Sequence, residues 1–254
     1  MNLNPERIAT RERLILTGLY LSKYDSLGLK KLGFESFVEA FNVLGYAMAS
    51  RPASIKNYRD EFDPVFPNPR KGWHKRPMRA CCLKVLQEYQ NLDFESFTGL
   101  VKSFVLYDEN LWSEFRSGAE RDDKEACFAA RLATGIAAEQ YFESVHSTIA
   151  EFEGYALENT THLGCGYDFR LQADTLEDSL AVEVKGLRDQ NGSVSLTPKE
   201  HEAAAAMGDR FFLFVVKNFR DTPFHEMFRN PLLSKLVFRR NERVVVQVSW
   251  LATV

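Results

Sequence analysis

The chain of 254 residues has few cysteines, no long apolar run and almost no excess of charge of either sign. Its four cysteines show no C-x-x-C spacing, which argues against a zinc site and a disulfide framework and favours a reducing cytoplasm. No apolar run approaches the length of a membrane span, and the polar N-terminus lacks the apolar segment of a secretory signal. We therefore expect a cytoplasmic globular protein with no membrane partner.

A net charge of −3 does not by itself indicate a nucleic-acid-binding protein, but the charges are unevenly distributed. Residues 1–116 hold 17 Lys and Arg against 14 Asp and Glu, a net +3, whereas residues 117–254 hold 15 against 21, a net −6. Eight basic and three acidic residues fall within residues 51–79. Nucleic-acid affinity depends on the local density of Lys and Arg, so a basic half that holds DNA is compatible with an acidic half that holds a divalent cation.

The pattern along the chain predicts an α/β (mixed α+β) protein with a helical domain at residues 1–116 and a mixed domain at residues 117–254. The boundary is placed at residues 117–123, which are small and charged. Apolar spacing predicts helices at residues 11–22, 34–45, 53–62, 76–89, 94–106 and 124–142. Strands are predicted before residue 161 and at residues 167–171, 180–187, 193–196, 211–216 and 244–248. A capping box at residues 197–200, Thr-Pro-Lys-Glu, begins a further helix.

Two charged residues interrupt the otherwise apolar segment 180–187. In a strand, positions i and i+2 share a face, so Glu183 and Lys185 point the same way. If Asp168 lies on the neighbouring strand, two carboxylates and one ammonium converge. Carboxylate oxygens suit Mg²⁺, which keeps waters and substrate phosphate oxygens as further ligands. A lysine beside the metal can orient or deprotonate such a water, so this set is equipped to hydrolyse a phosphodiester. The alternative is a solvent-facing salt bridge between Glu183 and Lys185.

These residues resemble the PD-(D/E)xK nuclease superfamily, and residues 134–216 resemble its NO VEIN C-terminal type of domain. The resemblance is carried by four ordered segments: Gly-Tyr-Asp-Phe at 166–169, Val-Glu-Val-Lys-Gly at 182–186, Ser-Leu-Thr-Pro-Lys-Glu at 195–200, and Asp-Arg-Phe-Phe-Leu-Phe-Val-Val at 209–216. It implies a restriction-endonuclease-like αβββαβ core with a mixed central sheet. It also implies metal ligands at Asp168, Glu183 and the carbonyl of Val184, and a catalytic lysine at Lys185.

The same resemblance implies a Mg²⁺-dependent endonuclease, with Mn²⁺ as a substitute, that cuts double-stranded DNA as a type II restriction enzyme. A homodimer for double-strand cleavage and a cognate DNA methyltransferase are implied as partners. Two alternatives stay open. One is a repair or modification-dependent nuclease of the same fold, and the other is a catalytically silent DNA-binding protein. The complete set of charged residues argues against silence, because clustered carboxylates do not help a protein to bind phosphates.

Glu139 lies on the predicted helix that precedes the Asp168 strand. Many superfamily members carry an acidic residue there that reaches the metal directly or through water, so we expect a catalytic role for Glu139. The alternative is an ordinary glutamate on a helix surface. Thr197 and Glu200 belong to the family segments, but helix capping explains both without chemistry.

The basic window at residues 51–79 predicts the DNA contact. The helix at residues 53–62 follows another helix and a tight turn, as in a helix-turn-helix, and loosely resembles helical modules attached to some restriction endonucleases. Its residue types, and those of the loop that follows, contact base edges and phosphates. The predicted DNA-binding residues are Lys56, Asn57, Arg59, Arg70, Lys71, Trp73, Lys75 and Arg76. The alternative is a charged face that only contacts solvent.

Overall fold

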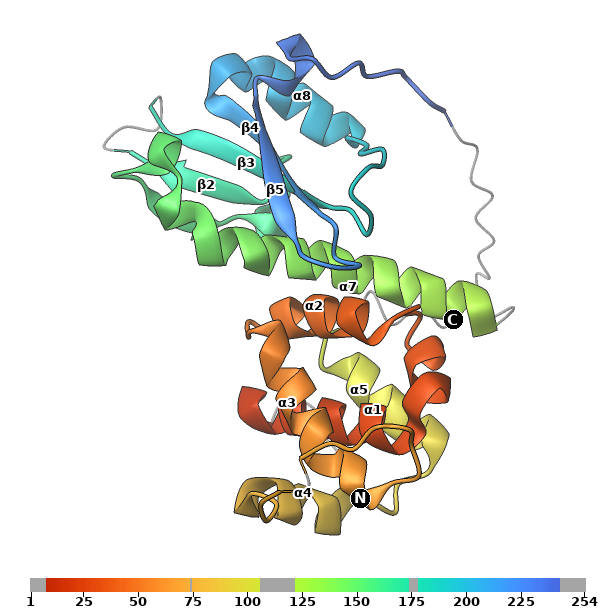
Figure 1. Ribbon diagram of the computed structural model, residues 1–254. Helices are drawn as coiled ribbons and strands as arrows, with labels where there is room; N and C mark the ends of the chain where they lie inside the picture. Colours follow the sequence, from red (N-terminus) through yellow and green to blue (C-terminus); the bar gives the residue numbers. More distant parts are fainter. Residues whose placement is uncertain (1–7, 74, 106–121, 174–177, 243–254) are drawn as a thin grey trace, which may run out of the picture.

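The computed structural model describes residues 8–73, 75–105, 122–173 and 178–242 (Figure 1). The predicted strand at residues 244–248 and most of the predicted boundary at residues 117–123 lie outside these ranges. Within the described residues, the N-terminal part contains five α-helices, as predicted: α1 (Thr10–Lys31), α2 (Phe37–Ala47), α3 (Pro52–Phe62), α4 (Ala80–Tyr89) and α5 (Phe94–Ser103). In the described part of the chain, no helix combines the length and apolar character that a membrane crossing requires.

Side-chain caps explain where two of these helices, α2 and α5, begin. The hydroxyl of Ser36 accepts a hydrogen bond from the backbone N–H of Glu39 at the start of α2. The carboxylate of Asp93 accepts one from Ser96 at the start of α5. These side chains satisfy backbone donors that lack a partner within the helix.

The second part contains α7 (Asp122–Val145), β1 (Ala156–Asn159), β2 (Phe169–Gln172), β3 (Leu180–Gly186), α8 (Pro198–Met207), β4 (Phe211–Lys217) and β5 (Phe224–Arg229). The strands form one sheet in the order β1-β2-β3-β4-β5. β3 and β4 are parallel, and the other neighbours are antiparallel. The predicted mixed fold class and αβββαβ order are therefore confirmed, with β5 as an additional strand.

Residues 193–196, predicted as a strand, are irregular. The prediction was wrong because the apolar side chains of this segment pack against a face of the sheet, so its backbone does not extend the sheet as a further strand. Val194 and Leu196, the alternate apolar residues of this segment, pack against the cluster of Leu213, Val215 and Phe228.

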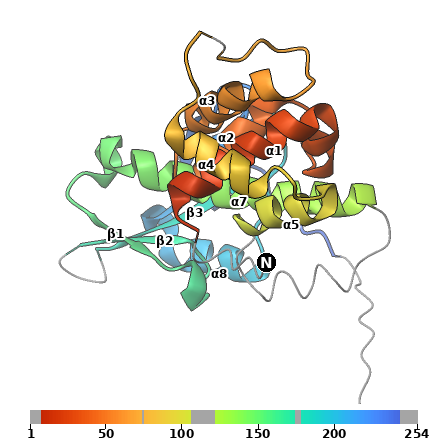
Figure 2. The same ribbon diagram turned by 90° about the horizontal axis from the view of Figure 1, so that it is seen from below.

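The sheet lies between α7 on one face and α8 on the other, and Figures 1 and 2 show α7 running between the N-terminal helices and the sheet. Val182 and Val184 join the large core that also includes Phe142 of α7. Ala181 faces the opposite way and packs with Ala204 of α8 and with Phe211. Because alternate residues share a face, Glu183 and Lys185 lie on the α8 side with Ala181.

A seam of polar contacts joins the N-terminal helices to the segments that follow β3 and β4. The guanidinium of Arg188, just after β3, donates to Glu35 at 2.9 Å and to Glu39 at 3.1 Å. The amide of Asn42 on α2 donates to the carbonyls of Phe219 and Asp221, at 2.9 and 2.6 Å. The large apolar core is also continuous from α1 to β4. The two parts thus pack as one body.

Candidate active site

Asp168 lies directly beside the Glu183–Lys185 segment. Its backbone N–H donates to the carbonyl of Val182 at 3.1 Å, and its Oδ2 accepts from the N–H of Val184 at 2.8 Å. Backbone and side chain are therefore both anchored on β3. The structure thus brings together the three residues that the sequence placed on neighbouring strands.

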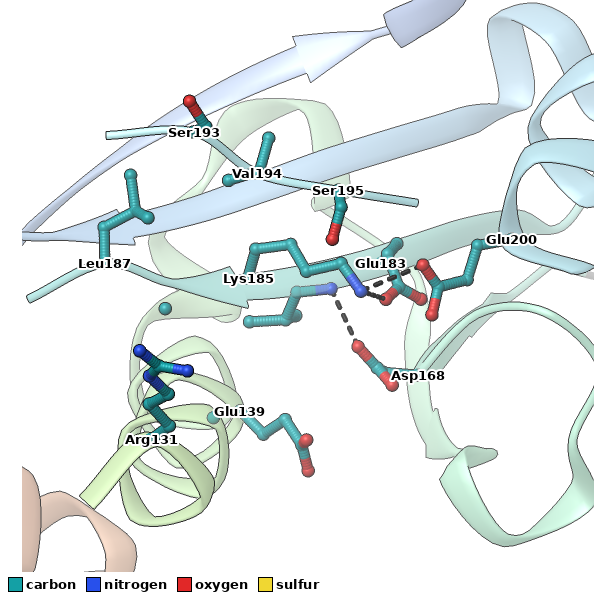
Figure 3. Close-up of a pocket in the computed structure, with 13 residues that line it drawn as sticks. Arg131, Glu139, Asp168, Glu183, Lys185, Leu187, Ser193, Val194, Ser195 and Glu200 are labelled. Atoms are coloured by element: carbon teal, nitrogen blue, oxygen red, sulfur yellow. Dashed lines mark hydrogen bonds and ion pairs between the residues drawn. The ribbon is translucent and has the colours of Figure 1, made fainter. Parts of the chain in front are cut away.

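The start of β2 leaves one side of β3 open. The β2–β3 register begins with Phe169 opposite Val182, so β2 does not extend along the C-terminal half of β3. Side chains from α7 and α8 reach into this opening. The result is a pocket of about 360 Å³ that Asp168, Glu183, Val184, Lys185, Glu139 and Glu200 line together with Arg131 (Figure 3).

A close approach between α7 and β3 brings Glu139 to this pocket. A Cβ atom on Gly186 would lie 2.7 Å from the carbonyl oxygen of Thr134 on α7, which is closer than packed atoms allow. Glycine at the end of the Glu-x-Lys segment therefore lets α7 pack against β3. Glu139, one turn further along α7 than Gly135, then faces the same space as Asp168.

Lys185 is held between two carboxylates. Its Nζ lies 2.5 Å from Oε1 of Glu183 and 2.9 Å from Oε2 of Glu200. Glu200 also accepts the N–H of Thr197 at 2.9 Å, and the hydroxyl of Thr197 accepts the N–H of Glu200. The predicted capping box is confirmed, and Glu200 has a second role that capping alone does not reveal. Its place in a family segment was the signal for that role.

The pocket concentrates carboxyl groups away from water. Burial raises the pKa of Glu183 to about 8 and that of Glu139 to about 7, and the nearby charge of Asp168 contributes to both shifts. Burial also raises the pKa of Asp168 itself, although the N–H of Val184 and the charge of Lys185 oppose the shift. Buried carboxylates with too few positive partners favour binding of a proton or a cation.

Lys185 has the opposite balance. Burial acts to lower the pKa of its ammonium, but the carboxylates of Glu183 and Glu200 outweigh that effect and the pKa is raised. The side chain is therefore protonated at neutral pH. In this state Lys185 donates hydrogen bonds and offsets negative charge, and it does not accept a proton.

The donor set fits a hard divalent cation with an incomplete protein shell. Among the described residues, no group of three or more His, Cys, Asp and Glu side chains is arranged to hold a metal ion by itself. Asp168 and Glu183 provide two carboxylates, and Val184 lines the same pocket. Oxygen ligands of this number suit Mg²⁺, which keeps several waters. The raised pKa values show that positive charge would be stabilising there.

Comparison with known families adds to this geometry. Residues 138–229 match the family model described as protein NO VEIN, C-terminal. This segment is therefore similar to a NO VEIN C-terminal domain, which is of the PD-(D/E)xK type, and it is called the NO VEIN domain from here on. The search of curated proteins and the search of solved structures each found no match. The NO VEIN domain runs from within α7 to the end of β5, so it contains Glu139 and the whole Asp168–Glu183–Lys185 set.

The N-terminal helices lie outside the NO VEIN domain, and the structure corrects one of the contacts predicted for them. Arg59 is buried, with 7% of its surface exposed. Its guanidinium pairs with Asp60 at 2.8 Å and with Asp63 at 3.6 Å, and it stacks on the ring of Phe37. Arg59 is therefore a structural residue that neutralises buried carboxylates, and its side chain is not exposed for contact with DNA.

Other predicted DNA contacts are also engaged within the protein. Arg70 pairs with the buried Asp63 at 2.9 Å and also with Asp25. Arg76 pairs with the buried Glu61 and lies over the ring of Trp73. Sequence counts recorded the positive charges of this window but not their internal partners.

The remaining predicted DNA contacts are exposed. Lys56 pairs with Asp60 at 2.8 Å, and about half of its side chain is exposed. Asn57, Lys71 and Lys75 are exposed, and 43% of Trp73 is exposed. The loop between α3 and α4, which carries Lys71, Trp73 and Lys75, lies on the side of the helical part away from the sheet (Figures 1 and 2). This loop and the pocket therefore lie on different sides of the molecule.

Proposed function

We propose that this protein is a divalent-cation-dependent DNA endonuclease of the type II restriction class. The observation that supports it most is the meeting of Asp168, Glu183, Lys185 and Glu139 in one pocket of a NO VEIN domain. Double-strand cutting would use two copies of this site, so a homodimer is part of the proposal. A cognate methyltransferase would protect the DNA of the cell.

In this proposal, Asp168, Glu183 and the carbonyl of Val184 hold one or two Mg²⁺ ions, for which Mn²⁺ can substitute. When bound, the metal makes a coordinated water more acidic and offsets charge on the phosphate. Glu139 reaches the cation directly or through a water. Its place on α7, opposite β3, lets carboxylates from two elements face the same phosphate-binding space.

Lys185 is proposed to position the attacking water and stabilise charge. Because its ammonium is protonated and held by Glu183 and Glu200, its position is set before substrate arrives. Such preorganised charge lowers the barrier without reorganisation during the reaction. The water oxygen bonds to phosphorus, the bond from phosphorus to the 3′ oxygen breaks, and a proton lost by the water ends on that 3′ oxygen. The products are a 5′-phosphate and a 3′-hydroxyl.

Cleavage of mixed genomic DNA tests this proposal. Purified protein is incubated with methylated and with unmethylated DNA in Mg²⁺, in Mn²⁺, in Ca²⁺ and in excess EDTA, and the ends are sequenced. We expect cutting in Mg²⁺ and Mn²⁺ at a fixed sequence, binding without cutting in Ca²⁺, and no cutting in EDTA. Full activity in EDTA contradicts the metal mechanism.

The same assay separates the alternatives. Cutting of methylated or damaged DNA alone indicates a modification-dependent or repair nuclease, and binding without cutting in any metal indicates a silent DNA-binding protein. Glu158→Gln is the matched control, because Glu158 pairs with Arg170 on the same sheet but does not line the pocket. It should cut at the wild-type rate.

A further inference from the structure

The pocket has a second cationic side chain that the proposed chemistry does not use. Arg131, Gly135 and Glu139 are spaced four residues apart on α7, so they share one face of the helix, and all three line the pocket. Figure 3 shows the Arg131 side chain rising from α7 toward the end of β3, away from the Glu139 carboxylate. The face of α7 thus presents a cation and a carboxylate about two turns apart.

Arg131 differs from Lys185 in its partners. Lys185 is engaged by Glu183 and Glu200. Arg131 is exposed, and within the residues that the structure describes it makes no ion pair and no hydrogen bond through its side chain. The carboxylates of the pocket repel an anionic ligand. A guanidinium with free donors at the edge of the pocket offsets this repulsion and can bind the anion.

Gly135 supports the same conclusion independently. Glycine lowers the stability of a helix interior relative to alanine, so it needs a reason there. Close packing explains Gly186 at the end of β3, but it does not explain Gly135, because a Cβ on Gly135 would meet no atom within 4 Å. The space over Gly135 belongs to the pocket between Arg131 and Glu139. The missing side chain therefore keeps a passage open above the helix.

We propose that Arg131 and Gly135 form a subsite for a backbone phosphate of the nucleic-acid strand being cut. The Arg131 guanidinium binds a phosphate next to the scissile one, and the strand crosses α7 over Gly135 to reach Lys185. Arg131 is thus a substrate-positioning residue, separate from the metal ligands. This inference rests on the proposed nuclease function.

The first test compares two helix glycines at which an added Cβ would meet no other atom within 4 Å. A Cβ on Gly99, inside α5, also meets nothing within 4 Å, and α5 does not contribute to the pocket. Gly135→Ala and Gly99→Ala should raise Tm by similar amounts, about 2 °C each. Gly135→Leu should raise KM for DNA cleavage about tenfold or more, whereas Gly99→Leu should leave KM unchanged. An unchanged KM in Gly135→Leu would contradict the proposal that the DNA strand crosses α7 over Gly135.

The second test measures charge at Arg131 without cleavage. Binding of a fluorescent duplex of mixed sequence is followed by anisotropy in Ca²⁺ over a range of KCl concentrations. Removing one phosphate-binding cation in Arg131→Ala should lower the slope of log K against log salt by about 0.9. Lys84→Ala, which removes an exposed charge on α4, should leave the slope unchanged. Arg131→Lys should keep the slope but recover only part of the cleavage rate, because it cannot bind a phosphate with two parallel donors.

The outcomes separate this subsite from the proposed function. If wild-type protein cuts DNA and Arg131→Ala binds with the wild-type slope, the subsite is wrong and the nuclease assignment stands. If wild-type protein neither binds nor cuts DNA, both are wrong. A lowered slope that Arg131→Lys restores, together with a raised KM, supports the subsite and excludes a purely structural role for Arg131.

Discussion

The helical part and the pocket both bury carboxylates, but with opposite consequences. In the helical part, burial alone would raise the pKa of Glu61, yet Arg76 and Arg79 outweigh it and the pKa is lowered. In the pocket, burial raises the pKa of Glu183 and Glu139, and Asp168 adds to the shift. All of these are glutamates withdrawn from water, so the number of positive partners decides the direction.

This difference separates buried charge that supports the fold from buried charge that is available for chemistry. A buried carboxylate with its own arginines is satisfied and resists change. Carboxylates that repel one another store an unfavourable energy that a bound cation would relieve. The comparison therefore predicts that replacing a buried glutamate with glutamine changes the free energy of unfolding in opposite directions in the two regions.

The largest effect on cleavage is expected from substitution of Lys185, the cation that contacts both Glu183 and Glu200 in the pocket. Lys185→Ala should lower the single-turnover rate of DNA cleavage by at least about 10²–10³-fold, because a preorganised charge is removed. Binding of DNA in Ca²⁺ should remain, since both proposed ligands are kept. Asp168→Ala should instead lose metal binding, as measured by Mn²⁺ titration. A wild-type rate in Lys185→Ala would mean that the Glu183–Lys185 pair is an ordinary salt bridge.

Glu61→Gln should destabilise the fold, because Glu61 is 3% exposed and accepts from Arg76, from Arg79 and from a backbone N–H. We expect a decrease of about 1–3 kcal/mol in the free energy of unfolding at pH 7, measured by urea titration. The folded-state pKa of Glu61 is lowered, so its contribution is present above the unfolded pKa of about 4.3 and is lost as the pH falls further. An equal decrease at pH 3 and pH 7 contradicts this origin.

Glu183→Gln should change the free energy of unfolding in the opposite direction and stabilise the fold at high pH. With a folded-state pKa of about 8, Glu183 keeps its proton in the folded chain after the unfolded chain has released it. Wild-type stability should therefore fall as the pH rises from about 4.3 to about 8. In EDTA, Glu183→Gln should be about 1–2 kcal/mol more stable than wild type at pH 9 and nearly equal to it at pH 4. A destabilised variant at pH 9 would show that the pairing with Lys185 dominates.

The smallest effect is expected from exposed cations of the helical part. Replacing Lys71 and Lys75 with alanine should leave Tm within about 1 °C of wild type, because neither side chain is buried. If this loop binds DNA, the slope of log K against log salt should fall by about 0.9 for each phosphate that the loop no longer neutralises. Arg59→Ala should instead lower Tm, since it leaves the buried Asp63 with fewer partners. If the slope of log K against log salt is unaltered in the variant that lacks both lysines, this loop does not contact DNA.

Local signals made much of the second part of the chain, residues 117–254, predictable. The Glu-x-Lys spacing defined one face of β3, the apolar run defined β4, and Thr197 with Glu200 defined the start of α8. β5 was missed because its six residues, Phe-His-Glu-Met-Phe-Arg, lack a regular alternation. Its position follows from pairing with β4, which is a non-local property.

Partners of side chains were harder to predict than elements. The sequence shows how many charges lie in residues 51–79 but not that Arg59 turns inward to Asp63. It shows that Glu200 can cap α8 but not that the same carboxylate contacts Lys185 of β3. Both contacts depend on tertiary packing, and only the second lies within a segment that the family resemblance marked.

The seam between α2 and the strands has a consequence for how this protein can evolve. The amide of Asn42 satisfies the carbonyls of both Phe219 and Asp221. A recombination event that joined residues 117–254 to an unrelated N-terminal half would leave those carbonyls, and the guanidinium of Arg188, without partners. New specificities are therefore expected to arise by substitution within both halves together, and not by exchange of one half for another.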